Sequence, residues 1–297
     1  MANELGTVAQ QLFAAEVKQA FQQTASELKN TVTLRTGVNA DTYKFRKMGA
    51  LTANQWDQGD VTYNPNSTGN EYAFPDLAGA TATHNLVSCN LTNWEGHVYT
   101  DLFEQAEVNF DERREVATAI AASLNRRCDQ LIIDALNAEA SPAATVGADP
   151  SSAAFSFANL RSVKAALDKK NVPTQDRVLL IHATQLSDLL GVEQVTSSDY
   201  QTARALVDGS INSVMGFRVI SLGDLTEGGL PHDATNNDRT TFAFHKSAIG
   251  MAVGKDMKVD VNYIPEKLAW LAVGTFKAGS VSIDGDGIVK INTDDAG

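Results

Sequence analysis

The longest uninterrupted helical pattern in the chain runs from residue 109 to residue 136. Asn109 suits the N-cap position, and Glu112 can reach back to its amide as in a capping box. Apolar residues recur at spacings of three and four, which places them on one stripe of a helix: Ala117, Ile120, Leu124, Cys128, Leu131 and Ala135. Four polar residues fall off this stripe: Glu115, Arg126, Asp129 and Gln130. The pattern fits either a core helix of an ordinary domain or a spine to which separate sheets attach.

The first 30 residues also show an amphipathic helical pattern, with Leu5, Val8, Leu12 and Ala15 at helical spacing. Their position at the end of the chain leaves two interpretations open. The segment is either a surface helix of the same domain or an arm that packs against a neighbouring subunit.

Residues 41–100 have a different character. Strand-like alternation appears at Tyr43 and Phe45, at Val61 and Tyr63, and again at Val87, Cys89 and Leu91. Between these strands lie more than 20 residues rich in Asn, Gly, Pro, Ser and Thr, which is turn and loop chemistry. We predict a long two-stranded excursion with its tip between Pro65 and Pro75. Because an isolated two-stranded ribbon is marginal in water, the excursion is expected to lie on a partner.

The stretch from Met48 to Asp111 contains no Lys and no Arg, so all of its charged residues are acidic. An acidic ribbon could lie on a basic strip of a neighbouring molecule, although solvation alone also accounts for the composition.

From residue 157 onward the pattern is α/β. We predict a helix over 157–170, a buried strand over 177–182 and a helix over 183–190 that Gly191 closes. A strand follows at 217–221, and a strand-turn element lies within 240–253. The chain after residue 257 is rich in strands, and the sequence Asp284-Gly-Asp-Gly predicts a hairpin there.

Composition narrows the class of protein. The chain has 297 residues, enough for one large domain or two smaller ones, and its hydrophobic content of 43% supports a core. No apolar run approaches the roughly 18 residues of a spanning helix, and no secretory signal begins the sequence. The two cysteines favour folding in a reducing, cytoplasmic environment. The net charge of −12 argues against a protein that grips nucleic acid, but an acidic wall could still enclose it.

Motifs for catalysis or ligand binding are missing or incomplete. Asp284-Gly-Asp-Gly lacks the later Glu of a calcium loop, so a β-turn is favoured. The stretch from Gly250 to Lys255 is one residue too short for a phosphate loop. The five histidines show no metal-site spacing: His84, His97, His182, His232 and His245. We therefore predict no catalytic, cofactor-binding or metal-binding residue.

Five blocks of sequence, taken in order, resemble one family. They are 13–35, the helical block 107–136, 173–190, the Gly-Phe-Arg-Val-Ile strand 216–220 and the Phe-His-Lys-Ser-Ala-Ile-Gly element 244–250. In this order the chain resembles the major capsid proteins of tailed double-stranded DNA phages, and it looks most like those of small podoviruses. The resemblance covers nearly the whole chain, but none of its blocks is a strict motif.

The resemblance implies an α+β protein with the HK97-like capsid fold. Its parts would be an N-terminal arm (1–40), an extended β-hairpin called the E-loop (41–96), a P-domain (97–170) with the spine helix 109–136, an α/β A-domain (171–256), and returning strands of the P-domain with the C-terminus (257–297). A loop at 191–200 or at 228–239 would meet its copies at the five-fold and six-fold centres. Ile133 and Leu136, off the helical stripe, would contact the A-domain side or a neighbouring subunit.

The implied function is a shell protein of the virion that assembles in the host cytoplasm. Its hexamers and pentamers would form an icosahedral head around double-stranded DNA, without sequence-specific binding. Implied partners are a portal and a separate scaffolding protein, since the arm beginning at Met1 is short, and a decoration protein is a further candidate. Without a lysine between Met48 and Asp111, no isopeptide crosslink is expected from the E-loop. No enzyme activity, cofactor or membrane is implied.

Two alternatives stay open on the sequence. An encapsulin-like compartment around an enzyme cargo would use the same fold. A cytoplasmic α/β enzyme or binding protein would use the long loop as a lid, and would be a monomer or small oligomer with a saturable ligand.

Overall fold

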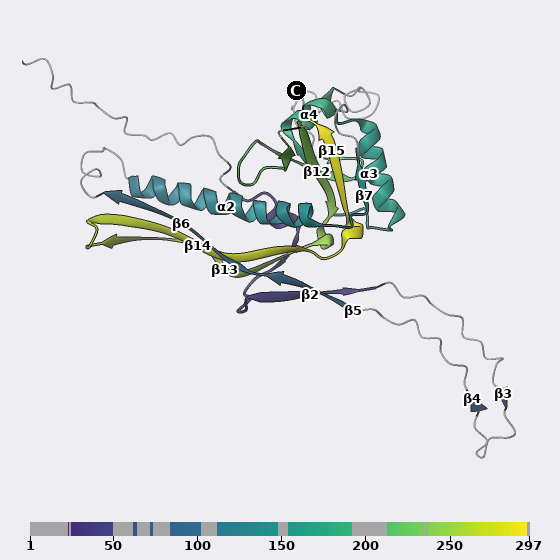
Figure 1. Ribbon diagram of the computed structural model, residues 1–297, viewed down its shortest axis with the longest axis horizontal. Helices are drawn as coiled ribbons and strands as arrows, with labels where there is room; N and C mark the ends of the chain where they lie inside the picture. The colour runs from purple at the N-terminus through teal and green to yellow at the C-terminus, as the bar shows by residue number, and fades with distance from the viewer. Residues whose placement is uncertain are drawn as a thin grey trace, which may run out of the picture.

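A long helix, two large sheets and a projecting ribbon dominate the described part of the protein, as the computed structural model shows (Figure 1). The structure describes residues 23, 25–49, 62–63, 72–73, 84–101, 112–147, 154–191, 213–233, 235 and 237–295. The predicted N-terminal helix therefore lies outside the described residues up to residue 22. The last part of that prediction is wrong, because residues 25–28 are non-helical and η1 (Lys29–Thr31) is a 3-10 turn.

The long helix is α2 (Glu112–Ala138), which confirms the predicted element, while the proposed cap at Asn109 lies outside the described residues. Figure 1 shows α2 lying lengthwise over a four-stranded sheet. The order of that sheet is β1-β13-β14-β6, with the bounds β1 (Thr33–Arg35), β13 (Ile249–Ile264), β14 (Ala269–Ser282) and β6 (Thr92–Asp101). At Gly274 the helix comes so close that a Cβ atom there would lie 2.5 Å from Ile120. Because Gly274 has no side chain, α2 can pack directly against the strands.

The second sheet has seven strands in the order β7-β15-β12-β8-β10-β9, with β11 also paired to β12. Their bounds are β7 (Ala144–Val146), β8 (Arg177–His182), β9 (Ser213–Val214), β10 (Phe217–Leu222), β11 (His232–Asp233), β12 (Asp238–His245) and β15 (Ile288–Asp294). β8 and β10 run parallel, whereas β12 is antiparallel to both β8 and β15. Every residue of β8 is buried, as its continuous apolar run predicted.

Two helices and the end of α2 cover the faces of this sheet. The predicted helices are confirmed as α3 (Phe157–Lys169) and α4 (Ala183–Leu190), with Gly191 at the C-cap of α4. Leu179 and Ile181 of β8 pack in a core with α3 and α4, while Val178 and Leu180 join the core that contains α2. The alternation of side chains along β8 thus serves two separate cores.

The C-terminal half of α2 buries more of its surface than one stripe. Ile132, Ile133 and Leu136 are each 0% exposed and lie in the same core as Leu180 and Phe242 of the second sheet. The stripe residues Leu131 and Ala135 are only partly buried. Of the two contacts expected for Ile133 and Leu136, the one with the A-domain side is therefore confirmed, and neither side chain is left exposed for a neighbouring subunit. The reason is that this half of α2 lies against both sheets, so two of its sides face apolar strands.

The hairpin predicted at Asp284–Gly287 is also wrong. The strands before and after it belong to different sheets, since β14 pairs with β13 and β6, whereas β15 pairs with β12 and β7. A single 3-10 turn, η5 (Gly285–Gly287), redirects the chain, and the Asp284 carboxylate accepts the amide of Asp286. The sheets also divide the chain differently from the expected boundary at 256/257. That boundary falls inside β13, and β15 lies in the seven-stranded sheet.

The predicted excursion is confirmed where the structure describes it. β2 (Thr42–Met48) pairs antiparallel with β5 (His84–Asn90), and β3 (Thr62–Tyr63) pairs with β4 (Tyr72–Ala73). The base of the β2–β5 ribbon is fixed to the four-stranded sheet, where the Phe45 ring lies over Gly250. A Cβ atom at Gly250 would lie 2.6 Å from that ring. Gly250, which begins the incomplete phosphate-loop pattern, lies within strand β13. Its missing side chain leaves the space that the Phe45 ring of the ribbon occupies.

We expect Ile133→Asp to unfold the protein as Leu124→Asp does, because both side chains are buried in the core around α2. Each change should cost several kcal/mol, since a buried unpaired carboxylate is added and packing is lost. Urea unfolding of the subunits measures this. Thr118→Asp adds the same charge on the exposed side of α2 and should unfold close to the wild-type midpoint. A wild-type midpoint for Ile133→Asp would contradict the position of α2 between the sheets.

Candidate assembly surfaces

A buried carboxylate on α2 holds the segment that precedes η1. Asp129 is 0% exposed. One of its oxygens accepts the Gln23 side-chain amide at 2.6 Å and the Glu27 backbone amide at 3.0 Å. The other accepts the Ser26 hydroxyl at 2.5 Å and the Leu28 backbone amide at 3.2 Å. The sequence pattern had placed Asp129 on the polar side of the helix. No local signal could show that residues more than 100 positions earlier in the chain cover it.

A second buried carboxylate fixes the end of the described chain. Asp295 accepts hydrogen bonds from the Arg239 guanidinium at 2.7 Å and from the Thr184 hydroxyl. Both charged residues are nearly inaccessible, with side-chain exposures of 8% and 4%. His182 and His232 lie 3.5 and 3.8 Å from the same carboxylate, so the fold brings together two histidines that are 50 positions apart. Burial acts to raise the pKa of Asp295, but the bonds from Arg239 and Thr184 outweigh it and lower the pKa.

We expect Asp295→Asn to destabilise the folded subunit at pH 7 by about 1.5–3 kcal/mol, the usual contribution of hydrogen bonds to a charged group. Because the folded pKa of Asp295 lies below the unfolded value of about 3.9, its contribution is present above pH 4 to 5. It is lost as the pH falls through the folded pKa. Urea unfolding at a series of pH values should therefore show the difference from wild type shrinking in acid. Asp134→Asn on the exposed side of α2 is the control, and a difference that did not change with pH would contradict this account.

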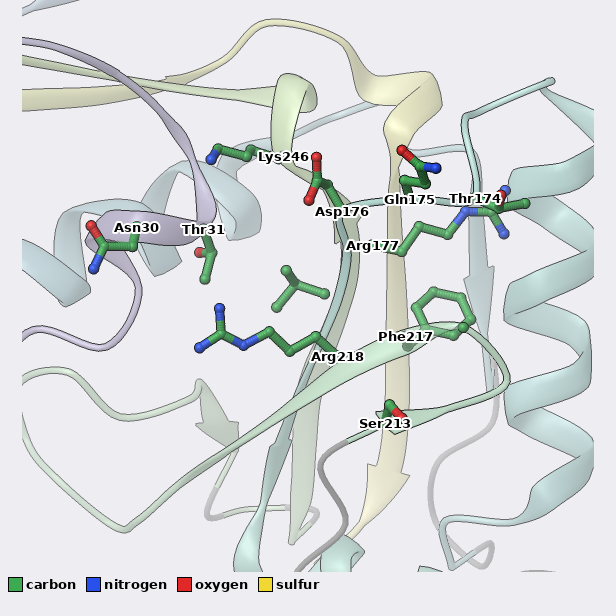
Figure 2. Close-up of a pocket in the computed structure, with 12 residues that line it drawn as sticks. Asn30, Thr31, Thr174, Gln175, Asp176, Arg177, Ser213, Phe217, Arg218 and Lys246 are labelled. Atoms are coloured by element: carbon green, nitrogen blue, oxygen red, sulfur yellow. The ribbon is translucent and has the colours of Figure 1, made fainter. Parts of the chain in front are cut away.

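A basic groove lies between η1 and the N-terminal ends of β8 and β10. It encloses about 440 Å³, and Figure 2 shows Arg218, Lys246 and Asp176 around its opening. A second depression of about 490 Å³ shares Asn30, Asp176 and Lys246 with it and adds Lys29. Lys29, Arg218 and Lys246 form no ion pair in the part of the chain that the structure describes. Three cations without an ion-pair partner among the described residues therefore line one surface, and the Asp176 carboxylate lies among them.

The remaining polar candidates have structural surroundings. His245 caps the 3-10 turn η4 (Lys246–Ala248) by accepting the Ser247 amide, and His97 lies 6.2 Å from the Tyr99 ring. Burial raises the pKa of the Cys89 thiol, and it raises the pKa of Cys128 to about 11, so both thiols are protonated at neutral pH. Among the described residues, no three His, Cys, Asp or Glu side chains gather in a way that could hold a metal ion.

Large hydrophobic side chains are exposed in two places. Met48 and Leu86, each 58% exposed, lie on the β2–β5 ribbon. The others lie at one end of the four-stranded sheet: Val98, Tyr99, Val261, Tyr263 and Leu268. Exposed apolar side chains that gather in this way mark surfaces for other macromolecules.

Comparison with known proteins gives the family. The sequence matches the phage capsid protein family over residues 5–295. This chain belongs to the phage capsid protein family. It is 32% identical over 133 residues to the major capsid protein of Escherichia phage T7, a match that covers 43% of this chain and 36% of that protein. The minor capsid protein of the same phage matches at the same identity over 31% of its length. The chain thus matches about a third of the length of these relatives.

Solved structures agree in fold over nearly the whole chain. The capsid structure of the cyanophage P-SCSP1u has a TM-score of 0.70 at 18% identity and covers 100% of this chain and 97% of its own. The head structure of the Helicobacter pylori bacteriophage KHP40 has a TM-score of 0.70 at 12% identity, with 95% of each chain covered. The expected α+β capsid fold of the HK97-like type is confirmed. None of the helices in the described part of the chain has the length and hydrophobicity of a membrane span.

Proposed function

We propose that this phage capsid protein is the major shell subunit of an icosahedral head around double-stranded DNA. The observation that carries the proposal is the family match over residues 5–295, together with a capsid fold across the whole chain. In this role the protein is a component of the virion and assembles in the host cell from hexamers and pentamers of itself. The encapsulin-like compartment and the enzyme with a lid loop receive no support from the family match.

The parts of the fold take the following roles in this proposal. α2 and the four-stranded sheet form the P-domain, and the seven-stranded sheet with α3 and α4 forms the A-domain, including β15. Residues 41–96 form the E-loop and residues 1–40 the arm, and each adds strand residues to the P-domain sheet, the arm as β1 and the end of the E-loop as the start of β6. One of two loops, 191–200 or 228–239, meets its copies at the five-fold and six-fold centres. Most of the first loop lies outside the described residues. Each role is assigned from position in the fold and from the resemblance.

The mechanism is mechanical and needs no catalytic residue or cofactor. Neighbouring subunits bury apolar and hydrogen-bonding surface until the contacts close a shell, and permanent interfaces of this kind exceed about 2,000 Å². Because the subunit carries a net charge of −12, the inner wall can enclose DNA without binding its phosphates tightly. A portal and a separate scaffolding protein complete the assembly, and a decoration protein is a further candidate. The E-loop has no lysine beyond Met48, so no crosslink starts from its projecting part and the contacts are non-covalent.

We expect the excursion to be needed for assembly and dispensable for folding. Met48 pairs with His84 at the end of the ribbon, so a two-residue Asn-Gly turn can replace residues 49–83. The shortened subunit should remain soluble, and its free energy of unfolding should stay within about 0.5 kcal/mol of wild type, because the core lies elsewhere. It should not form stable shells in electron micrographs. Normal particles from this variant would contradict the role given to the E-loop.

The basic groove is the surface of a neighbouring subunit that best fits the acidic E-loop. We expect Arg218→Glu with Lys246→Glu to leave the fold intact, since both side chains are exposed, and to reduce assembly at low salt. Adding Asp57→Lys and Asp60→Lys in the excursion should restore part of the lost assembly, because the groove is then acidic and the excursion carries the matching positive charges. Sedimentation of assembled against free subunits gives the yield. Arg218→Lys with Lys246→Arg is the matched control, and failure of the exchanged charges to restore any assembly would count against this pairing.

A further inference from the structure

One ring nitrogen of His182 makes two contacts that require opposite protonation states. His182 is the last residue of β8 and the N-cap of α4, and its side chain is 6% exposed. Its Nδ1 atom accepts the backbone amide of Thr184 at 3.4 Å, which caps α4. The same Nδ1 atom lies 3.0 Å from the hydroxyl oxygen of Thr184. The capping bond needs a bare nitrogen, whereas the second contact is a hydrogen bond only if a proton lies between the two atoms.

The Thr184 hydroxyl does not supply that proton. A hydroxyl has a single hydrogen, and Thr184 donates it to the buried carboxylate of Asp295. Towards His182 the hydroxyl oxygen can therefore only accept. A hydrogen bond between the two side chains then exists only when Nδ1 of His182 carries a proton. In that state a continuous chain of donors runs from the imidazolium through the hydroxyl to the carboxylate.

Asp224 determines which nitrogen of the neutral ring holds its hydrogen. One oxygen of Asp224 lies 3.4 Å from Nε2 of His182. An ionised carboxylate only accepts hydrogen bonds, so the hydrogen of the neutral ring lies on Nε2 and Nδ1 is bare. Neutral His182 therefore caps α4. A second proton can bind only at Nδ1, the atom that holds the cap.

Charged groups from three further segments surround the ring. Asp295, at the end of β15, has an oxygen 3.5 Å from Nδ1. Arg239 on β12 donates to the carboxylates of both Asp295 and Asp224, and His232 on β11 lies 3.8 Å from Asp295. The two carboxylates favour a second proton on His182, whereas the guanidinium and a protonated His232 oppose it. One added proton makes this group of two carboxylates and one guanidinium electrically neutral.

We propose that His182 is a pH-sensitive cap of α4. In acid, Nδ1 gains a proton and donates to the Thr184 hydroxyl, so the Thr184 amide loses its acceptor and the first turn of α4 loosens. Histidine is the side chain that ordinarily changes its charge between about pH 5 and 8. The other half of the capping box stays in place, because the His182 amide donates to the Gln185 side chain at 2.9 Å in either state. Protonation therefore loosens the start of α4 without unfolding the sheet beneath it.

The end of α4 gives this cap a consequence for the shell. Gly191 at the C-cap of α4 leads directly into 191–200, one of the two loops assigned above to the five-fold and six-fold centres. A looser α4 loosens the base of that loop. This consequence rests on the proposed function, whereas the pH-sensitive cap is a property of the single subunit.

Amide hydrogen exchange of unassembled wild-type subunits measures the cap directly. The exchange rate of each amide is divided into that of an unstructured peptide at the same pH, which gives a protection factor free of the intrinsic effect of pH. From about pH 8 to about pH 5.5 the protection factor of the Thr184 amide should fall about five-fold, the effect of losing a typical cap. The Asn159 amide is the internal control, because its cap is the hydroxyl of Ser156, which does not titrate. Equal protection of Thr184 at both pH values would overturn the proposal.

His182→Asn tests whether His182 is the group that titrates. Asn is a good N-cap whose side-chain oxygen gains no proton, so protection of Thr184 should be the same at both pH values. His232→Asn removes the other histidine beside Asp295 and should keep the wild-type fall. A pH dependence that persisted in His182→Asn would overturn the proposal, and if this variant does not fold, the wild-type measurement decides alone. Failure of the wild-type chain to form any particle would instead overturn the proposed function and leave these exchange results unaffected.

Discussion

One helix has to bury two different faces, and the rest of the structure depends on this. The N-terminal half of α2 rests on the four-stranded sheet through Ile120 and Leu124, and its C-terminal half also meets the seven-stranded sheet. A single continuous core therefore includes residues of the helix and of both sheets. Burying one such side chain contributes about 1.5–3 kcal/mol, against a total stability of about 5–15 kcal/mol for a typical domain. The two sheets are thus joined through α2 into one folding unit.

Buried carboxylates attach both ends of the described chain to this unit. Asp129 binds residues 23–28 to α2, and Asp295 binds the end of β15 to Arg239 on β12. A buried charge is tolerated only where donors surround it, and each of these carboxylates has at least two. The donors come from segments distant in sequence. Each carboxylate therefore specifies how a terminal segment lies, in addition to any stability that it contributes.

Local patterns were sufficient where the pattern itself states which faces are buried. The continuous apolar run of β8 predicts burial on both faces, the stripe of α3 and the alternation in β2 each predict burial on one, and the structure agrees with all three. Predictions failed where a second environment intervened. Ile133 was left off the buried stripe because a helical stripe assumes one buried face. The turn at Asp284 resembled a hairpin because sequence cannot show that its two strands enter different sheets.

The candidate surfaces divide in the same way. The acidic composition of the excursion is visible in sequence alone, as is the lack of any catalytic motif. The basic groove is not, because Lys29, Arg218 and Lys246 come from three separate segments that only the fold brings together. The exposed apolar side chains at one end of the four-stranded sheet likewise come from β6, β13 and the turn at Leu268, and the left-handed backbone of that leucine has no sequence signature.

The position of Asp129 also determines where mechanical load enters the subunit. The carboxylate holds residues 23–28, which precede the three-residue strand β1 at the edge of its sheet. Tension on the N-terminal segment therefore reaches α2 before it reaches β1. The helix packs against both sheets, whereas β1 pairs with β13 over only three residues, so the pull acts on α2 ahead of this short edge strand.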